Sequence, residues 1–107
     1  MEIKIPKVLK PINLQEYDEA LAGKTVLAWV NPTLAMLKEH DRIIKDGQDD
    51  EFFEWFRVIL SQGADAATHV TLENIAEWRE QDPSFWVWLI GAYWDLRKEH
   101  LAKKKAS

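Results

Sequence analysis

The most hydrophobic part of the sequence is residues 85–94, which carry no charge and include three tryptophans. Asp82 and Pro83 precede it, and this pair predicts a helix start, because aspartate caps free backbone amides and proline needs no N–H in the first turn. At helical spacing, this segment and its continuation have two apolar stripes. One stripe consists of Phe85, Leu89, Ala92 and Leu96, with Trp88 and Tyr93 beside it. The other, nearly opposite, consists of Val87, Ile90, Trp94 and Leu101.

A helix at the surface of a globular protein needs only one apolar stripe. Two stripes predict that this helix is either packed on both sides within its own domain or covered on one side by a partner. The uncharged run is also shorter than the roughly 20 apolar residues of a membrane-spanning helix, so we expect no membrane span.

Shorter periodic segments predict two strands and four further helices. Alternating apolar residues predict an edge strand or extended arm over residues 2–9, which Lys10 and Pro11 end. Residues 24–30 are β-branched and aromatic, so we predict a second strand there, paired with the first in a parallel or an antiparallel sense. Helices are predicted over residues 14–21, 32–45, 49–61 and 72–81.

The same spacing predicts which side of each helix is buried. In the 32–45 helix, which Asn31 and Pro32 begin, the buried face consists of Met36, Leu37, His40, Ile43 and Ile44. In the 49–61 helix it consists of Phe52, Phe56 and Ile59, flanked by Phe53, Trp55 and Leu60. In the 72–81 helix, which Thr71 caps, it consists of Leu72, Ile75 and Ala76, with Trp78 at one edge.

These elements indicate a mostly helical α+β protein with five helices and a small two-stranded β element near the N-terminus. We expect one globular domain over residues 1–102 and a flexible basic tail over residues 103–107. The composition, 47% hydrophobic and 30% charged, is typical of a soluble globular protein. The absence of cysteine excludes disulfides and thiolate metal sites, and the net charge of −4 disfavours general binding to the negatively charged backbone of nucleic acids.

The sequence contains no nucleophile motif, phosphate-binding loop or HExxH zinc motif, so we expect neither enzymatic activity nor a cofactor. His40, His69 and His100 each stand alone, without the spacing of metal ligands. Carboxylates cluster over residues 46–54, where the first turn of a helix favours negative charge without a bound cation. One alternative remains, an aromatic small-molecule or catalytic pocket that uses His40 and a nearby carboxylate.

The candidate functional residues are therefore aromatic and partner-binding. Gly91 lies in the middle of the last helix, where glycine costs about 1 kcal/mol relative to alanine. Close approach of another backbone, from this chain or from a partner, would compensate for that cost. Trp94 lies away from the main stripe of its helix, and other tryptophans lie at stripe edges. The predicted partner-binding set is Trp55, Trp78, Val87, Ile90, Gly91 and Trp94.

Three segments together suggest a family. They are Trp-Val-Asn-Pro at residues 29–32, Asp-Pro-Ser-Phe-Trp-Val-Trp-Leu-Ile at residues 82–90, and Tyr-Trp-Asp-Leu-Arg-Lys-Glu-His at residues 93–100, followed by a lysine-rich end. With the predicted elements, they resemble small tail assembly chaperones of long-tailed bacteriophages and prophages. The resemblance covers most of the chain and includes no catalytic signature.

This resemblance implies a non-enzymatic protein of the host cytoplasm that is absent from the mature virion. It implies binding to helical segments of the tape measure protein and recruitment of tail tube subunits during tail morphogenesis. It also raises the hypothesis that the codons of residues 103–105 form a frameshift site for a longer product. The alternative is a small helical adaptor or regulatory protein unrelated to phage, and self-association is compatible with either interpretation.

Overall fold

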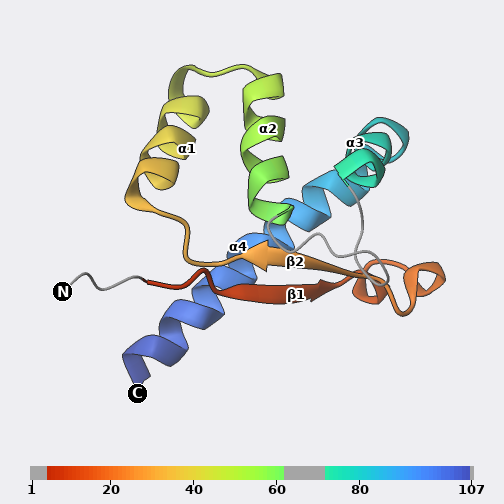
Figure 1. Ribbon diagram of the computed structural model, residues 1–107. Helices are drawn as coiled ribbons and strands as arrows, with labels where there is room; N and C mark the ends of the chain where they lie inside the picture. Colours follow the sequence, from red (N-terminus) through yellow and green to blue (C-terminus); the bar gives the residue numbers. More distant parts are fainter. Residues whose placement is uncertain (1–4, 62–71, 107) are drawn as a thin grey trace.

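The computed structural model describes residues 5–61 and 72–106 and combines a two-stranded sheet with helices (Figure 1). The described elements are β1 (Leu9–Asn13), the 3-10 turns η1 (Leu14–Glu16) and η2 (Glu19–Leu21), β2 (Thr25–Trp29), α1 (Leu34–Asp46), α2 (Asp49–Leu60), α3 (Leu72–Gln81) and α4 (Pro83–Ala106). In Figure 1, α4 passes behind the sheet, and α3 lies beside the N-terminal half of α4. The helices α1 and α2 form a hairpin above the sheet. The mostly helical α+β class and the β element near the N-terminus are confirmed.

The sheet begins later than the sequence predicted. β1 pairs with β2 in the antiparallel sense, with Leu9 opposite Trp29. The amide of Leu14 donates to the carbonyl oxygen of Lys24 at 3.1 Å, which continues the ladder past the end of β1. Because bonded positions alternate along an antiparallel pair, the backbone N of Pro11 faces away from β2. The prediction that this proline ends the strand is wrong, since it removes no bond from the ladder.

The predicted helix over residues 14–21 is also wrong, so the described residues contain four α-helices and not five. The side chain of Asn13 accepts from the Gln15 amide and begins η1, as a cap should. Asp18 then adopts an extended backbone and its carboxylate accepts from the Ala20 amide at 2.9 Å, which begins η2. The aspartate side chain thus competes with helix continuation and divides the segment into two turns.

The start of α1 differs from its prediction. Thr33 caps α1 by accepting from the Met36 amide at 3.2 Å, whereas Asn31 does not cap it. The side chain of Asn31 instead binds the chain before β1, because it accepts from the Val8 amide at 2.7 Å and donates to the Pro6 carbonyl at 3.0 Å. The asparagine therefore joins the segment that follows β2 to the segment that precedes β1.

The other helix starts agree with the sequence where the structure describes them. The carboxylate of Asp82 accepts from the Phe85 amide at 3.3 Å, as predicted for the start of α4. α2 begins at Asp49, and α4 continues through the three C-terminal lysines to Ala106. The predicted cap Thr71, the predicted loop over residues 63–70 and His69 lie outside the described residues.

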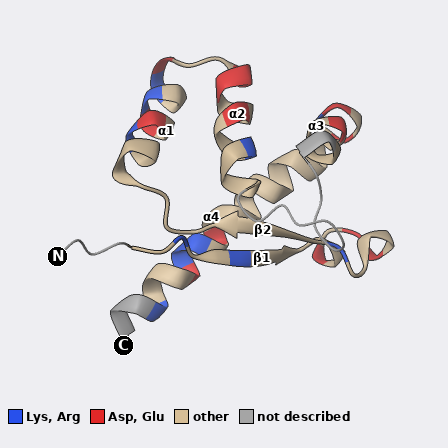
Figure 2. Cartoon of the chain, viewed as in Figure 1, with Lys and Arg blue, Asp and Glu red and all other residues tan. Residues whose placement is uncertain are grey.

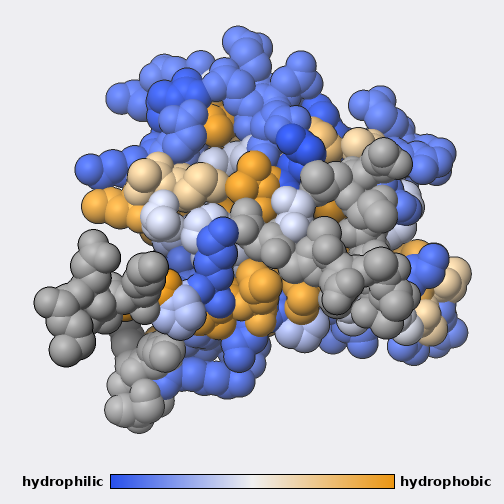
Figure 3. Space-filling model, in the orientation of Figure 1, coloured by the Kyte–Doolittle hydropathy of each residue, from blue (hydrophilic) through white to orange (hydrophobic). Residues whose placement is uncertain are grey.

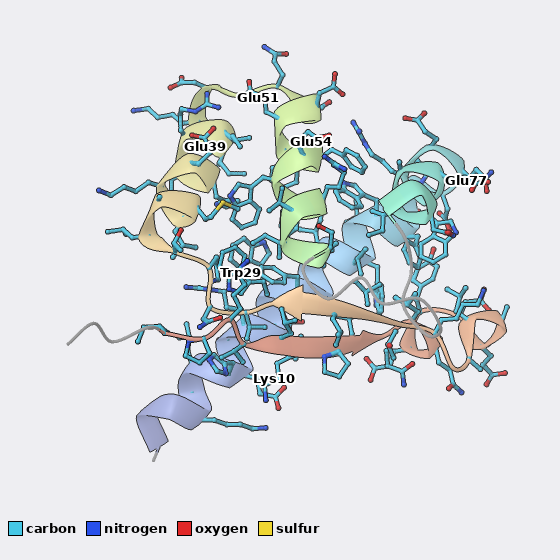
Figure 4. All side chains as sticks on the ribbon, in the orientation of Figure 1. Lys10, Trp29, Glu39, Glu51, Glu54 and Glu77 are labelled. Carbon is cyan, nitrogen blue, oxygen red and sulfur yellow. The ribbon has the colours of Figure 1, made fainter. Side chains whose placement is uncertain are left out.

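The α1–α2 hairpin carries much of the charge of the described residues, whereas the first half of α4 carries none (Figure 2). The guanidinium of Arg42 on α1 binds both Glu39 on α1 and Glu51 on α2, which face each other across the hairpin in Figure 4. These hydrogen bonds lower the pKa of both glutamates and raise that of Arg42. All three side chains are exposed to solvent, so the pairs orient the hairpin more than they stabilise it.

Aromatic residues dominate the core between α2, α4 and β2. Phe56, Leu89 and Tyr93 are fully buried, and Trp86 is only 9% exposed. Phe85 and Leu89 confirm the first stripe of α4 as its buried side. Ile44 was predicted to face inward on α1 but is 62% exposed, because α1 packs chiefly on α2 and buries a narrower face.

Candidate partner-binding surface

The second stripe of α4 faces solvent along much of its length. Val87 is 68% exposed and Leu101 is 42% exposed, Gly91 is exposed, and Ile90 and Trp94 are half-buried. We call this set the outer stripe: Val87, Ile90, Gly91, Trp94 and Leu101. Four of the six predicted partner-binding residues therefore lie together on one helix face. Such spacing fits a second helix that packs along α4.

Apolar exposure is not confined to α4. On the face that Figure 3 displays, hydrophobic side chains are exposed in the middle of the molecule, between the polar α1–α2 hairpin and the sheet. Leu34 and Ile44 of α1 are both more than 60% exposed. Single exposed residues of this kind are ordinary on a protein surface, whereas four residues of the outer stripe, Val87, Ile90, Gly91 and Trp94, are neighbours on one helix face. Arg97 and Lys98 separate these four from Leu101.

Trp55 is a core residue, so its prediction as a partner-binding side chain is wrong. It is 4% exposed, and its indole Nε1 donates to the Met36 carbonyl at 2.8 Å. Its ring stacks on that of Trp94 with a centroid distance of 6.1 Å and an interplanar angle of 17°. Trp55 therefore packs against the inner side of the Trp94 ring. The contact with α1 buries the Trp55 ring, which the sequence pattern placed at the edge of the apolar stripe of its helix.

Trp78 lies apart from the outer stripe. Its ring packs edge-on against Phe85 at 4.8 Å, beside a cleft of about 180 Å³ that Tyr17 also lines. The hydroxyl of Tyr17 donates to the Asp82 carboxylate at 2.8 Å, and this hydrogen bond raises the pKa of Tyr17. Trp78 thus joins the η1–η2 region to the start of α4, and the structure does not bring it together with the other predicted residues.

Gly91 has open space above it. A Cβ atom built on this glycine meets no heavy atom within 4 Å. Close approach by another backbone of the described chain therefore does not explain why glycine occupies this position. Of the two explanations that the sequence left open, only the approach of a partner remains as a prediction.

Replacing Gly91 with alanine should raise the free energy of unfolding by about 0.5–1 kcal/mol, because alanine favours the helix and the added methyl group has room. Urea denaturation of the isolated protein measures this change. Gly47→Ala is the matched control and should destabilise the protein, because a Cβ there lies 2.7 Å from the Cα of Ile43. A loss of stability in Gly91→Ala would contradict the open space above α4.

His40 occupies the half-buried position that the sequence predicted. Its imidazole lies 4.8 Å from the Trp55 ring and 5.0 Å from the Trp94 ring, measured between centroids, and its Nδ1 lies 3.5 Å from the Asp41 carboxylate. Within residues 5–61 and 72–106, no three histidine or carboxylate side chains are grouped so that they could hold a metal ion. In those same ranges, no helix has the length and apolar character needed to cross a membrane.

No protein-family model, no curated protein and no solved structure matches the chain. The outer stripe and its surroundings are therefore interpreted from their own geometry and from the resemblance that the sequence shows.

Proposed function

We propose that this protein is a phage tail assembly chaperone that binds an amphipathic helix of another protein along the outer stripe of α4. The observation that carries the proposal is the apolar group of Val87, Ile90, Gly91 and Trp94 on one face of α4, with exposed Val87 and open space over Gly91. Leu101 extends this face beyond the charged residues Arg97 and Lys98. Two of the three segments that resemble the family form this helix and its cap. The tape measure protein is the partner that the resemblance implies, and recruitment of tail tube subunits belongs to the same proposal.

The outer stripe has the properties of a helix-binding face. Burying exposed aliphatic side chains contributes about 25 cal/mol per Å² of apolar area removed from water. Trp94 is already held in place by its stacking on Trp55, so a partner helix would order little in this chain when it binds. Glycine at the centre of the stripe permits a close approach of two helix axes.

A chaperone of this kind would act in the cytoplasm of the infected host and be absent from the mature virion. Its gene should lie among tail genes, next to the gene for the tape measure protein. A helical adaptor unrelated to phage would lack that neighbourhood, so the flanking genes distinguish the two hypotheses.

Val87→Asp combined with Leu101→Asp should weaken capture of the co-expressed tape measure protein by at least about tenfold, since a helix that covers the stripe would bury two unpaired carboxylates. Affinity pull-down of the tagged chain measures this effect, and circular dichroism verifies that the variant is folded. Leu34→Asp combined with Ile44→Asp on α1 is the matched control, because it adds the same charge at two side chains that are about as exposed as Val87 but lie outside the stripe.

Undiminished capture by the α4 variant would reject the outer stripe as the binding face. Failure of the wild-type chain to capture any segment of the tape measure protein would reject the function itself.

A further inference from the structure

We infer that the helix bound by the outer stripe carries lysine or arginine beside its apolar side, and that these basic residues enter a groove between α4 and the β1–η1 segment. This inference rests on the proposed function, because it specifies the chemistry of the partner at the same site. It commits to a helix of another protein as the occupant.

The groove has a volume of about 460 Å³ and borders the outer stripe at Gly91. Gly91, Ala92 and Leu96 of α4 line it, and Trp88 of the same helix and Ile12 of β1 contribute further apolar surface. Since a Cβ on Gly91 would meet nothing, the groove and the stripe are continuous across this glycine. A single helix that crosses α4 at Gly91 therefore contacts both.

The polar side chains of the groove are mostly acidic. Glu16 of η1 and Asp95 and Glu99 of α4 line it, and no lysine, arginine or histidine does. Glu99 forms an ion pair with Lys103 at 3.2 Å, but Glu16 and Asp95 form none with the described residues. Two carboxylates without an ion-pair partner thus lie beside the apolar lining of the groove. This combination favours a positive charge at the end of an aliphatic side chain, as in lysine and arginine.

The free edge of β1 favours a helix over an added β-strand as the occupant of the groove. Pro11 lines the groove, and its backbone nitrogen faces away from β2, toward the position that an added strand would take. Proline has no N–H to offer such a strand, so β-sheet extension would lose a bond at the centre of this edge.

Trp88 adds an aromatic ring that can attract a cation placed over its face.

Two synthetic helical peptides of about 18 residues, or five turns, test this inference. Both carry the same leucine and alanine stripe, and the flanking positions are lysine in one peptide and glutamate in the other. Fluorescence anisotropy of the labelled peptides gives their affinities for the full chain. We expect the lysine peptide to bind at least about tenfold more tightly, with the difference shrinking as salt is added.

Glu16→Gln combined with Asp95→Asn should abolish the preference for the lysine peptide. Asp46→Asn combined with Glu80→Gln is the matched control, because it removes the same charge from two exposed carboxylates outside the groove. This control should keep the preference. An equal loss in both double variants would overturn the inference, since overall charge and not the groove would then explain the preference.

Equal affinity for the two peptides, or tighter binding of the glutamate peptide, would overturn the inference and leave the outer stripe as a binding face. Failure of both peptides to bind would also contradict the proposed stripe. Sedimentation of the wild-type chain and of the Glu16–Asp95 double variant tests whether a second copy of this chain occupies the groove. A dimer that only the wild type forms would overturn the inference that the occupant is a helix of another protein.

Discussion

Replacing Phe56 with alanine should lower the free energy of unfolding by about 3–5 kcal/mol, as expected for removing a large aromatic side chain from a core. Phe56 of α2 is 0% exposed. Its ring centroid lies 5.0–6.3 Å from those of six neighbours, namely Phe52, Trp55, Tyr93, Trp86, Trp94 and His40. No neighbouring side chain can fill the space without leaving its own contacts, so a cavity would remain.

This loss is a large share of the 5–15 kcal/mol that typically stabilises a domain. Urea denaturation followed by tryptophan fluorescence measures it. Val58→Ala is the control on the same helix, because Val58 is 36% exposed and its truncation should change stability by no more than about 0.5 kcal/mol. A change of under about 1 kcal/mol in Phe56→Ala would show that α2 does not pack on α4 as described.

Replacing Tyr93 with phenylalanine should cost about 1–3 kcal/mol near neutral pH, because a buried carbonyl would lose its partner. The hydroxyl of Tyr93 donates to the Trp29 carbonyl at 2.7 Å, and the tyrosine is 0% exposed. Trp29 lies in β2 at a position whose carbonyl faces away from β1, so the sheet offers no replacement donor. Phenylalanine keeps the ring contacts, which isolates the hydroxyl.

The cost of this substitution should shrink at high pH. Burial raises the pKa of Tyr93 to about 12, against an opposing effect of Arg97, whereas a tyrosine in the unfolded chain has a pKa near 10. Between these values the unfolded chain releases a proton that the folded chain retains, so rising pH favours unfolding. The wild type should therefore lose up to about 2–3 kcal/mol across this window that Tyr93→Phe does not lose.

Denaturation of both proteins at several pH values from neutral to about 12 measures this difference. Tyr17 also has a raised pKa, through its hydrogen bond to Asp82, but both proteins keep it, so its effect cancels. A gap in stability that stays constant over the window would contradict the burial of the Tyr93 hydroxyl.

The tryptophans show what the helical pattern of the sequence left undecided. In the sequence, Trp55 lies at the edge of its stripe and Trp94 lies in the second stripe of α4, and the helical pattern does not decide whether another element covers either ring. The structure buries Trp55 beneath α1 and leaves Trp94 half-exposed above it. The groove had no sequence signal, because Glu16 lies 79 positions from Asp95 and only the contact of β1 with α4 brings these two carboxylates together.

The sequence by itself determined the features that depend on neighbouring residues. The two stripes of α4 follow from a period of 3.6 residues, and its start follows from the Asp82 cap, which needs only the first helical turn. The strand at residues 25–29 follows from its β-branched and aromatic composition. These are local preferences, and the tertiary structure leaves them unchanged.

Only the tertiary structure decided the features that depend on distant partners. Pro11 remains within a strand because β2 lies on the side that needs no N–H, and Asn31 binds the segment before β1 because the sheet places that backbone beside it. Ile44 is exposed because, among the described elements, α1 packs chiefly on α2 and turns that side away from it. In each case the residue types permit both outcomes, and the burial and hydrogen bonding supplied by remote segments select one.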